Sequence, residues 1–332
     1  MRTKFYSVFF LFLGLRLSAQ ILLATPETAF DVQHNFNAEL LKMKNVRKIT
    51  FEIVDKKDYE IPIDKNLVET YEFDTNGLLS RFYFTNIVKT IEKQTTVTTR
   101  KGKKGYQTYT ESKNEYLYDT TSTSYYYNNG KLVLKRYFDG AMFYESRYYR
   151  YDSLGNVVKE LRYRETNNSR DKNYFILGTQ LLLSEDSFQY KKYPNGQLHC
   201  FSLNNENRPY KQQINYYDVL GLKIKTSEHY TAASWITQEH TYEYKGGRLS
   251  AASFKGNADK EVNLRVTFEY DMYNQLLTEK RYKNDVLQKE LSYITNSADK
   301  LLSSLVIRDH VNRSIRIVKL KYDFGSLSSK EK

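Results

Sequence analysis

Cysteine, proline and tryptophan are scarce in this chain of 332 residues, which contains one, four and one of them respectively. The single cysteine, Cys200, excludes an intramolecular disulfide, so the stability of the fold must come from a packed core. The chain is long enough to bury a sizeable core. Few prolines favour long sheets, because proline cannot donate a hydrogen bond to a sheet ladder. Beyond the first twenty residues, no apolar run has the length of a transmembrane helix.

Motifs for common catalytic and metal-binding chemistries are also missing. The five histidines are scattered without a His-Glu-x-x-His pattern, and no Gly-x-Ser-x-Gly, P-loop or dinucleotide fingerprint occurs. His229 and His240 flank a turn at Thr231–Ser234, but a hairpin closing there pairs His229 with Ile236 or Thr237. The sequence therefore predicts no catalytic residue, no cofactor and no metal site.

Tyrosine and phenylalanine are abundant, with 31 and 18 residues, and many of them precede short turn sequences. The clearest unit is Tyr149–Tyr163, YRYDSLGNVVKELRY. Tyr149 and Tyr151 lie two apart and face one side of a strand. Asp152 is suited to cap a type I turn, and Gly155 accepts the positive φ that ends it. The unit therefore predicts two strands joined by a tight turn.

The same unit recurs in two forms at steps of mostly about 25 to 27 residues, a period typical of repeat architectures. One form begins its turn with Asp and ends it with Gly or Asn. A shorter form has Asn-Gly or Gly-Gly, which suit two-residue type I′ turns. The aspartates are expected to organise the turn backbone and not to act as acid–base catalysts. The predicted structural turn residues are Asp74, Gly77, Gly130, Asp152, Gly155, Gly196, Asp218, Gly221, Gly247, Asp271 and Asn274.

These units predict an all-β fold, a repetitive antiparallel β-meander of roughly 16 to 20 strands. The phased motifs are Tyr71/Phe73/Asp74/Gly77, Tyr149/Tyr151/Asp152/Gly155, Tyr217/Asp218/Gly221 and Tyr270/Asp271. With them, the chain resembles the YD-repeat (Rhs-like) family over about Tyr71–Leu327. That family comprises bacterial secreted and cell-surface proteins whose repeats form long β-sheets that wind into shells. The resemblance implies a long twisted or rolled sheet of YD-repeat-like hairpins in an exported protein.

The N-terminus has the pattern of a signal peptide over residues 1–19. Arg2 and Lys4 form a basic region, and Phe5–Leu15 is apolar but too short to span a bilayer. The expected cut follows Ala19; a buried first strand or an uncleaved anchor is the alternative. The remaining predicted boundaries are an N-terminal cap segment over 20–45, a YD-repeat-like β domain over 46–327 and a polar tail over 328–332.

Within the cap segment the sequence predicts a short helix. Thr25 is suited to cap it, with Pro26 at the first helical position. Phe36, Leu40 and Met43 then share one face. Because repeat proteins usually cover their first repeat, we expect this segment to cap the first edge of the sheet.

The chain is basic, with a net charge of +12. Lysines and arginines solvate exposed strands, but they also favour anionic partners. Lys101, Lys103 and Lys104 lie in a glycine-flanked loop of a predicted projecting hairpin. We predict weak binding of an anionic partner there; a solvated hairpin tip is the alternative.

Taken together, the sequence favours an exported binding or structural scaffold protein of the bacterial cell envelope, in the periplasm, on the outer-membrane surface or outside the cell. Its aromatic and basic sheet surface would contact an envelope glycan or another envelope protein; nucleic acid is not expected. The alternative is a glycan-processing enzyme with a site formed across strands, which a buried acidic pair in a concave pocket would favour.

An outer-membrane barrel is a third hypothesis, and it needs a lipid-facing row without charge. Strand Leu276–Tyr282 carries Lys280 on one face and Glu279 with Arg281 on the other. Neither face of this strand therefore suits lipid.

Overall fold

The structure, a computed structural model, describes residues 20–31, 34–100, 106–140, 142–171, 174–232, 236–256 and 262–325. These residues form one short helix and 18 strands. The elements are α1 (Ala38–Met43), β1 (Val46–Lys57), β2 (Ile63–Phe73), β3 (Leu79–Arg100), β4 (Tyr106–Asn128), β5 (Lys131–Phe138), β6 (Tyr144–Tyr151), β7 (Val157–Asn167), β8 (Leu177–Lys192), β9 (Leu198–Leu203), β10 (Pro209–Tyr217), β11 (Lys223–Tyr230), β12 (Gln238–Lys245), β13 (Arg248–Gly256), β14 (Val262–Tyr270), β15 (Leu276–Lys283), β16 (Val286–Thr295), β17 (Leu302–Asp309) and β18 (Ser314–Phe324).

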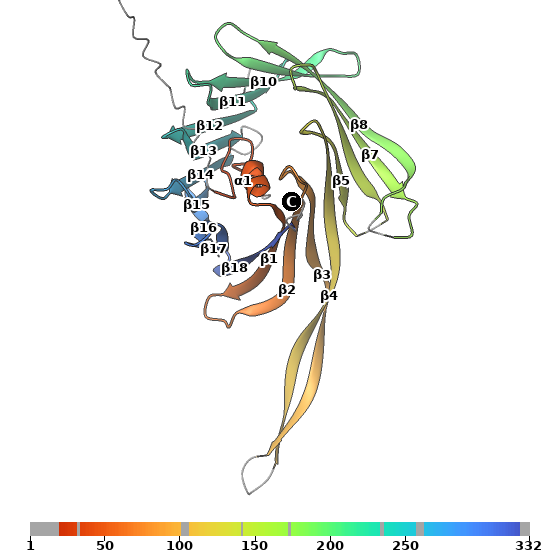
Figure 1. Ribbon diagram of the computed structural model, residues 1–332, viewed down its shortest axis with the longest axis vertical. Coiled ribbons are helices and arrows are strands. Elements are labelled where there is room, and N and C mark those ends of the chain that lie inside the picture. Colours follow the sequence, from red (N-terminus) through yellow and green to blue (C-terminus); the bar gives the residue numbers. More distant parts are fainter. Residues whose placement is uncertain are drawn as a thin grey trace, which may run out of the picture.

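The strands form a single meander that closes on itself. Each strand pairs antiparallel with the next along the chain, and β1 also pairs with β18, from Val46↔Phe324 to Lys57↔Ser314. Figure 1 shows the resulting barrel, with β10–β18 forming one wall and β1–β8 the other. The predicted all-β antiparallel meander with one short N-terminal helix is confirmed. The predicted long twisted or rolled sheet is in fact closed into a barrel, because pairing β1 with β18 satisfies the backbone groups that two free edges would expose.

The turns that begin with aspartate share one hydrogen-bond pattern. Asp152 Oδ1 accepts from the amides of Leu154 and Asn156 at 2.9 and 2.8 Å. Asp74, Asp218 and Asp271 accept from the corresponding amides of their own turns. These bonds fix the turn so that its last residue has positive φ: 76° at Gly77, 91° at Gly155, 79° at Gly221 and 66° at Asn274. Gly130, Gly196 and Gly247 also have positive φ, of 74°, 83° and 77°.

Tyrosines placed just before the turns connect neighbouring hairpins. Tyr151 Oη donates to the carbonyl of Leu132 at 2.6 Å, and Tyr322 Oη donates to that of Leu302 at 2.6 Å. Each acceptor is the first or second residue of the strand before the tyrosine's own strand. Tyr127, Tyr244 and Tyr270 make the same kind of bond, to Leu79, Lys223 and Leu249. The recurring tyrosine of the sequence unit thus links one hairpin to the next.

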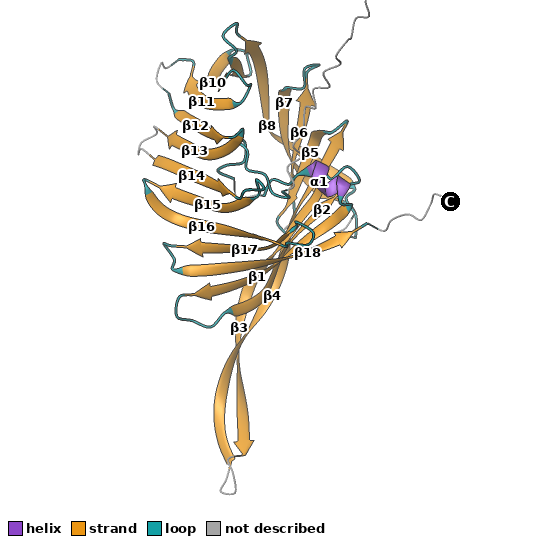
Figure 2. Cartoon of the chain, turned by 60° about the vertical axis from the view of Figure 1, so that its left-hand side comes forward, coloured by secondary structure: helices purple, strands orange, loops and turns teal. Residues whose placement is uncertain are grey.

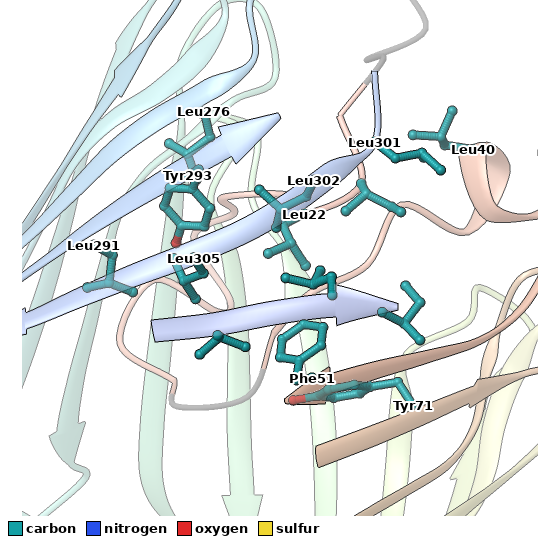
Figure 3. Packing of buried hydrophobic residues seen from close by; sticks show 14 of the residues in the cluster. Leu22, Leu40, Phe51, Tyr71, Leu276, Leu291, Tyr293, Leu301, Leu302 and Leu305 are labelled. Atoms are coloured by element: carbon teal, nitrogen blue, oxygen red, sulfur yellow. The ribbon is translucent and has the colours of Figure 1, made fainter. Parts of the chain in front are cut away.

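The segment 20–45 lies inside the barrel, against the inner face of its wall. Leu22, Leu40 and Leu41 join an apolar cluster with Phe51 and Leu305, and Figure 3 shows several members pointing toward one another. Because the closed sheet presents no terminal edge among the described strands, the segment fills part of the interior and caps no edge. No helix of the described residues has the length and apolar character needed to cross a membrane.

The helix lies further along the chain than the sequence indicated. Residues 26–30 form turns, in which the Thr25 and Thr28 hydroxyls bond each other at 2.9 Å. The helix begins after Asn37, whose side chain accepts from the amide of Leu40 at 3.2 Å and caps it. Met43, expected on the buried face, is 64% exposed. The Asn37 cap is followed by apolar residues that pack against the inner wall. Together they favour a helix start more strongly than the Thr-Pro sequence upstream does.

Strands β3 and β4 extend far beyond the rest of the wall. β2 pairs with β3 only as far as Phe84, and β5 pairs with β4 only from Ser122 onward. Beyond these points the two strands pair with each other, up to Arg100↔Tyr106. Figure 2 shows this two-stranded arm projecting below the barrel.

Alternation along each strand separates an inner from an outer face. On β14, Val266 and Phe268 point inward and are buried, whereas Arg265 and Glu269 lie on the outer face. Outer ion pairs join neighbouring strands, such as Lys280–Glu269 at 3.4 Å. Further outer pairs are Lys225–Glu239 and Lys321–Glu52. The outer face of the part of the barrel formed by β11–β18 and β1 is therefore charged.

Candidate functional site

Two adjoining pockets lie along the inner face of the wall, and the N-terminal segment lines one of them. The deeper one, of about 220 Å³, is lined by apolar side chains such as Leu22, Phe51 and Phe268 together with charged ones. The outer one, of about 530 Å³, is bordered by residues of β1, β2, β4 and β16–β18. Lys289, Ile307 and Arg316 line both. We call the two pockets together the interior cavity.

Glu279 is the most enclosed charged group of the interior cavity, with only 5% of its surface exposed. Arg281 Nε donates to its Oε1 at 2.5 Å, and Tyr293 Oη donates to its Oε2 at 2.8 Å. Arg281 also donates to the carbonyl of Asp31 at 3.2 Å. The carboxylate is thus compensated, as a buried charge requires, and the same arginine anchors the N-terminal segment.

Glu69 is another carboxyl group that lines the deeper pocket. Tyr71 Oη donates to Glu69 Oε2 at 3.1 Å. Burial raises the pKa of Glu69, although the Tyr71 hydrogen bond and the charge of Arg316 oppose the shift. Glu69 therefore favours its neutral form more than an ordinary glutamate does.

His34 enters the cavity from the N-terminal segment. Its ring lies 5.2 Å from that of Phe51 and 6.1 Å from that of Tyr71. Burial, together with the nearby charge of Arg281, lowers the pKa of His34 to about 4. The imidazole is therefore neutral near pH 7, and the cavity's positive charge comes from arginine and lysine.

The mouth of the interior cavity is rich in cations. Arg316 forms a two-pronged ion pair with Asp55, at 2.8 and 3.2 Å, and Lys289 lies 3.8 Å from Asp309. Lys57 and Lys65 also line the mouth, and neither forms an ion pair with any described residue. Their charge is available to an anion. The cavity thus combines an apolar floor with a cationic entrance.

The predicted turn residues lie away from this cavity. None of the eleven lines either of its pockets. Gly221 and Gly247 border a separate pocket of about 550 Å³ together with Tyr217 and Tyr244. Their contacts are those of hairpin turns. Lys101, Lys103 and Lys104 lie outside the described residues.

His229 and His240 of the barrel wall do not converge. His229 contacts Gln212, with Nε2 2.9 Å from Oε1. His240 instead packs its ring 4.9 Å from Phe254, on the inner face. Within the described ranges no three His, Cys, Asp or Glu side chains are grouped as metal ligands.

A second buried charge, Glu165, lies on the outer face of β5–β8. It accepts from Ser146 Oγ at 2.5 Å, Arg136 Nε at 3.0 Å, Tyr148 Oη at 2.7 Å and Gln180 Nε2 at 2.8 Å. Burial opposes its charge, but these donors prevail and lower the pKa of Glu165. With no exposed surface, this carboxylate serves the structure and is closed to ligands.

The cavity residues are those that the sequence analysis missed. One signal was available: Glu69 is in phase with Tyr71 and Phe73, so a carboxyl shares the buried face of β2. Asp55 is likewise in phase with Phe51 and Ile53. A charge in phase with buried apolar residues indicates a polar site inside the core.

Comparisons with known proteins leave the family open. No family model matches the chain, and no curated protein matches it. Among solved structures, a porin-like protein from Bacteroides uniformis is similar over 84% of this chain and 97% of its own, with 12% identity and a TM-score of 0.37. A TcdB2-TccC3-Cdc42 structure is similar over 81% of this chain and 15% of its own, with 13% identity and a TM-score of 0.23. Similarities this low assign no function.

The predicted membership of the YD-repeat family is wrong. No family model supports it, and the sheet closes through β1 and β18, whereas the family implies a long sheet that winds into a shell. The motif Tyr-x-Tyr-Asp-x-x-Gly specifies a hairpin, a capped turn and a link to the next hairpin. Those local contacts suit any antiparallel meander, so the motif does not determine the path of the whole sheet.

Proposed function

We propose that this chain is an exported, non-enzymatic binding protein of the cell envelope that holds a small, partly apolar anion in its interior cavity. The observation that carries the proposal is the pairing of an apolar floor with the free cations Lys57 and Lys65 at the entrance. Apolar pockets with a few well-placed polar groups are the usual form of small-molecule sites. The barrel wall provides rigidity, and the N-terminal segment forms the inner boundary.

The outer face of the part of the wall formed by β11–β18 and β1 is charged and suits contact with water. Its ion pairs include Lys280–Glu269 and Lys321–Glu52. A lipid-facing barrel carries an apolar outer band, because charges there are costly. These ion pairs support an aqueous part of the envelope as the proposed location.

The test uses octanoate as the probe and octylammonium as its cationic counterpart, with binding measured by isothermal titration calorimetry. Octanoate should bind with a saturable isotherm and octylammonium should not. Lys57→Gln should weaken octanoate binding about tenfold, the effect of losing about 1.4 kcal/mol. Lys319→Gln, in an exposed position on the outer face, is the matched control and should leave binding unchanged. Equal binding of both probes, or of neither, would contradict the proposal.

The basic residues between β3 and β4 are a separate proposed contact. Replacing Lys101, Lys103 and Lys104 with Gln should reduce the salt-sensitive binding of the chain to envelope fractions, because exposed cations act through screened electrostatics. Octanoate binding in the cavity should be unaffected by this triple change. Envelope binding that does not vary with salt would remove the loop from the proposal.

A glycan-processing enzyme is the second candidate, and one observation favours it. Glu69 and Glu279 line the same pocket, and a carboxyl with raised pKa that shares a pocket with a second, paired carboxylate is an arrangement found in many acid–base sites. Hydrolysis is supported only if purified chain releases reducing ends from envelope glycan and both Glu69→Gln and Glu279→Gln abolish that release. Turnover that survives either change assigns it to a contaminant.

A further inference from the structure

The hairpin turns of the meander alternate between the two rims of the barrel. In an antiparallel meander, every turn that joins an even-numbered strand to the next strand lies at the same rim. The turns that begin with Asp152, Asp218 and Asp271 are of this kind, because they follow β6, β10 and β14. The arm of β3 and β4 leaves from the opposite rim (Figure 2). We call the rim that carries the three turns the Asp-turn rim.

The central positions of these three turns hold large apolar side chains that are in water. Val219 and Leu220 are 102% and 78% exposed, and Met272 and Tyr273 are 86% and 68% exposed. In the third turn Leu154 is 86% exposed. The Asp-turn rim therefore presents apolar tips at three of its hairpins.

The turn itself does not require apolar residues at these positions. The Asp74 turn makes the same hydrogen bonds, yet it carries Thr75 and Asn76 at its centre. The turn depends on its aspartate and on its last residue, so the two central residues are free to be polar. Apolar residues that recur at such equivalent, exposed positions indicate a contact with something outside the chain.

Exposed lysines lie beside two of the apolar tips. Lys300 Nζ is 5.5 Å from the centre of the Tyr273 ring, and Lys131 adjoins Gly155 in the turn that carries Leu154. Neither lysine forms an ion pair with any residue that the structure describes. The aspartates that open the three turns instead accept hydrogen bonds from amides of their own turns. The charges that remain available beside these tips are therefore positive.

The N-terminal part of the chain meets the barrel at the same rim. Gln20 Oε1 accepts from the amide of Leu276 at 2.8 Å, and Leu276 begins β15 just after the Asp271 turn. The apolar sequence Phe5–Leu15 lies a few residues before Gln20. A sequence of this kind enters a membrane during export. The Asp-turn rim is thus the part of the barrel that the membrane-seeking sequence joins.

We propose that the Asp-turn rim docks on the surface of a lipid bilayer that contains anionic lipids. Val219–Leu220 and Met272–Tyr273 enter the interfacial region at two separate points, and Leu154 provides a third. Lys131 and Lys300 lie at the level of the headgroups and attract those that are anionic. The charged outer face of β11–β18 and β1 stays in water.

A bilayer fits these tips better than a protein partner does. Four strand spacings separate the β10–β11 turn from the β14–β15 turn, a distance of about 19 Å at about 4.8 Å for each spacing. The turn between them consists of Gly246 and Gly247, which have no side chain to continue an apolar patch. A stable protein interface needs a continuous patch of about 800 Å² on each partner. A bilayer accepts separate side chains one by one, because the hydrophobic effect is non-directional.

The first test measures the insertion of one tip with brominated lipids, which quench tryptophan fluorescence. Trp235 is the single tryptophan of the chain, so Trp235→Phe provides the background for Leu220→Trp. Vesicles of phosphatidylglycerol and brominated phosphatidylcholine should quench the indole at position 220 and shift its emission to the blue. Val311→Trp in the same background is the matched control and should not be quenched, because Val311 is 61% exposed in the β17–β18 turn at the opposite rim.

Partition into vesicles of the same two lipid classes, measured by sedimentation, provides a second readout. The double change Leu220→Asp with Met272→Asp should weaken partition at least about tenfold, because membrane binding scales with the apolar area that is buried. Val311→Asp should leave partition unchanged.

The lysines are tested by omitting the anionic lipid. Vesicles of phosphatidylcholine alone should bind the chain more weakly, and Lys131→Gln with Lys300→Gln should remove much of that difference. Octanoate binding in the interior cavity should be the same in all these variants. The docking of the rim and the binding in the cavity can therefore fail independently.

Three outcomes would overturn the proposal. One is an indole at position 220 that brominated lipid does not quench, and another is quenching equal to that of Val311→Trp. The third is partition of the double aspartate variant equal to that of Val311→Asp. Loss of binding to envelope fractions in the double variant, without quenching at position 220, would assign the rim to a protein partner instead.

Discussion

Strands β12–β18, β1 and β2 bury apolar side chains on the inner face of the barrel, whereas β5–β8 bury an ion pair on the outer face. The apolar cluster includes Phe51, Val266, Leu291 and Leu305 but no fully buried member from β3–β11 among the described residues. In β5–β8 the fully buried side chains are instead Ser146 and Glu165, covered from outside.

The two regions bury different side chains because different segments of the chain cover them. The N-terminal segment reaches only one part of the inner face and packs there. The inner face of β6 and β7 instead carries ion pairs, such as Arg162–Glu145 at 2.7 Å and Arg147–Glu160 at 3.3 Å. On the outside of β5–β8, Phe175 lies 3.6 Å from the guanidinium of Arg136 and covers the ion pair. Closure satisfies the backbone everywhere, but side-chain burial depends on local cover.

The largest expected loss of stability comes from a change in the apolar cluster. Phe51 is 1% exposed, and its ring lies 5.0 Å from that of Tyr71. Phe51→Ala should lower the free energy of unfolding by about 3–5 kcal/mol, because it removes buried surface and leaves a cavity. Urea denaturation measures the loss.

The matched control for Phe51 is Phe201→Ala in β9, where the side chain is half-buried. Its loss should be well under half that of Phe51→Ala, since little apolar surface is buried there. Equal losses would show that strands β3–β11 have an apolar core of their own. The two regions would then not differ in how they bury side chains.

The next largest loss of stability is expected from a change in the buried ion pair of β5–β8. Glu165→Gln keeps the size of the side chain but removes the charge opposite Arg136, so we expect a loss of about 2–3 kcal/mol. Arg136→Met in the same chain should recover part of that loss, because no unpaired charge then remains buried. A double-mutant cycle in urea measures the coupling. Strictly additive losses would mean that the two groups do not stabilise each other.

Sequence patterns predicted the hairpins well because each hairpin is specified by nearby residues. Asp152 and Gly155 are three apart, and their turn depends on no distant contact. Alternation on β14 also separated Val266 from Arg265, since a strand with one buried face shows it directly.

Closure and the buried ion pair were not predictable in the same way. The β1–β18 ladder joins residues more than 250 positions apart, as in Asp55↔Arg316, and no local pattern marks the partner of a first strand. On β6, aromatic and charged residues occur on both faces, with Tyr148 outward and Arg147 inward. Alternation there could not show which face is buried. The interior cavity was missed for a related reason, because its carboxyls come from strands that only closure brings together.

A smaller effect concerns the N-terminal segment that fills the apolar half. The pKa of His34 is lowered to about 4, below its ordinary value of about 6.5. The unfolded chain therefore binds more protons between these values, and stability falls as the pH drops from about 6.5 through about 4. His34→Gln should remove about 1–3 kcal/mol of this pH dependence.

Urea denaturation from pH 7 to pH 4 measures the slope, and the difference between the two chains isolates His34. Glu69 contributes the opposite sign, because its raised pKa favours the folded state at low pH, and it is present in both chains. Identical slopes would mean that His34 is solvated in the folded protein, and the N-terminal segment would then not be packed against the wall.

The smallest expected effect compares the same hydrogen bond in the two halves. Tyr322 donates to the carbonyl of Leu302, which is 6% exposed, and Tyr151 donates to that of Leu132, which is half-buried. Replacing either tyrosine with phenylalanine removes one hydroxyl and keeps the ring. Tyr322→Phe should cost about 1–1.5 kcal/mol, because the acceptor it leaves is shielded from water, whereas Tyr151→Phe should cost about 0.5 kcal/mol, since water can replace the lost donor. Both losses are measurable by urea denaturation. A larger loss for Tyr151→Phe would show that the Leu132 carbonyl is better shielded from water than the Leu302 carbonyl. That result would contradict the assignment of the more buried core to β12–β18, β1 and β2.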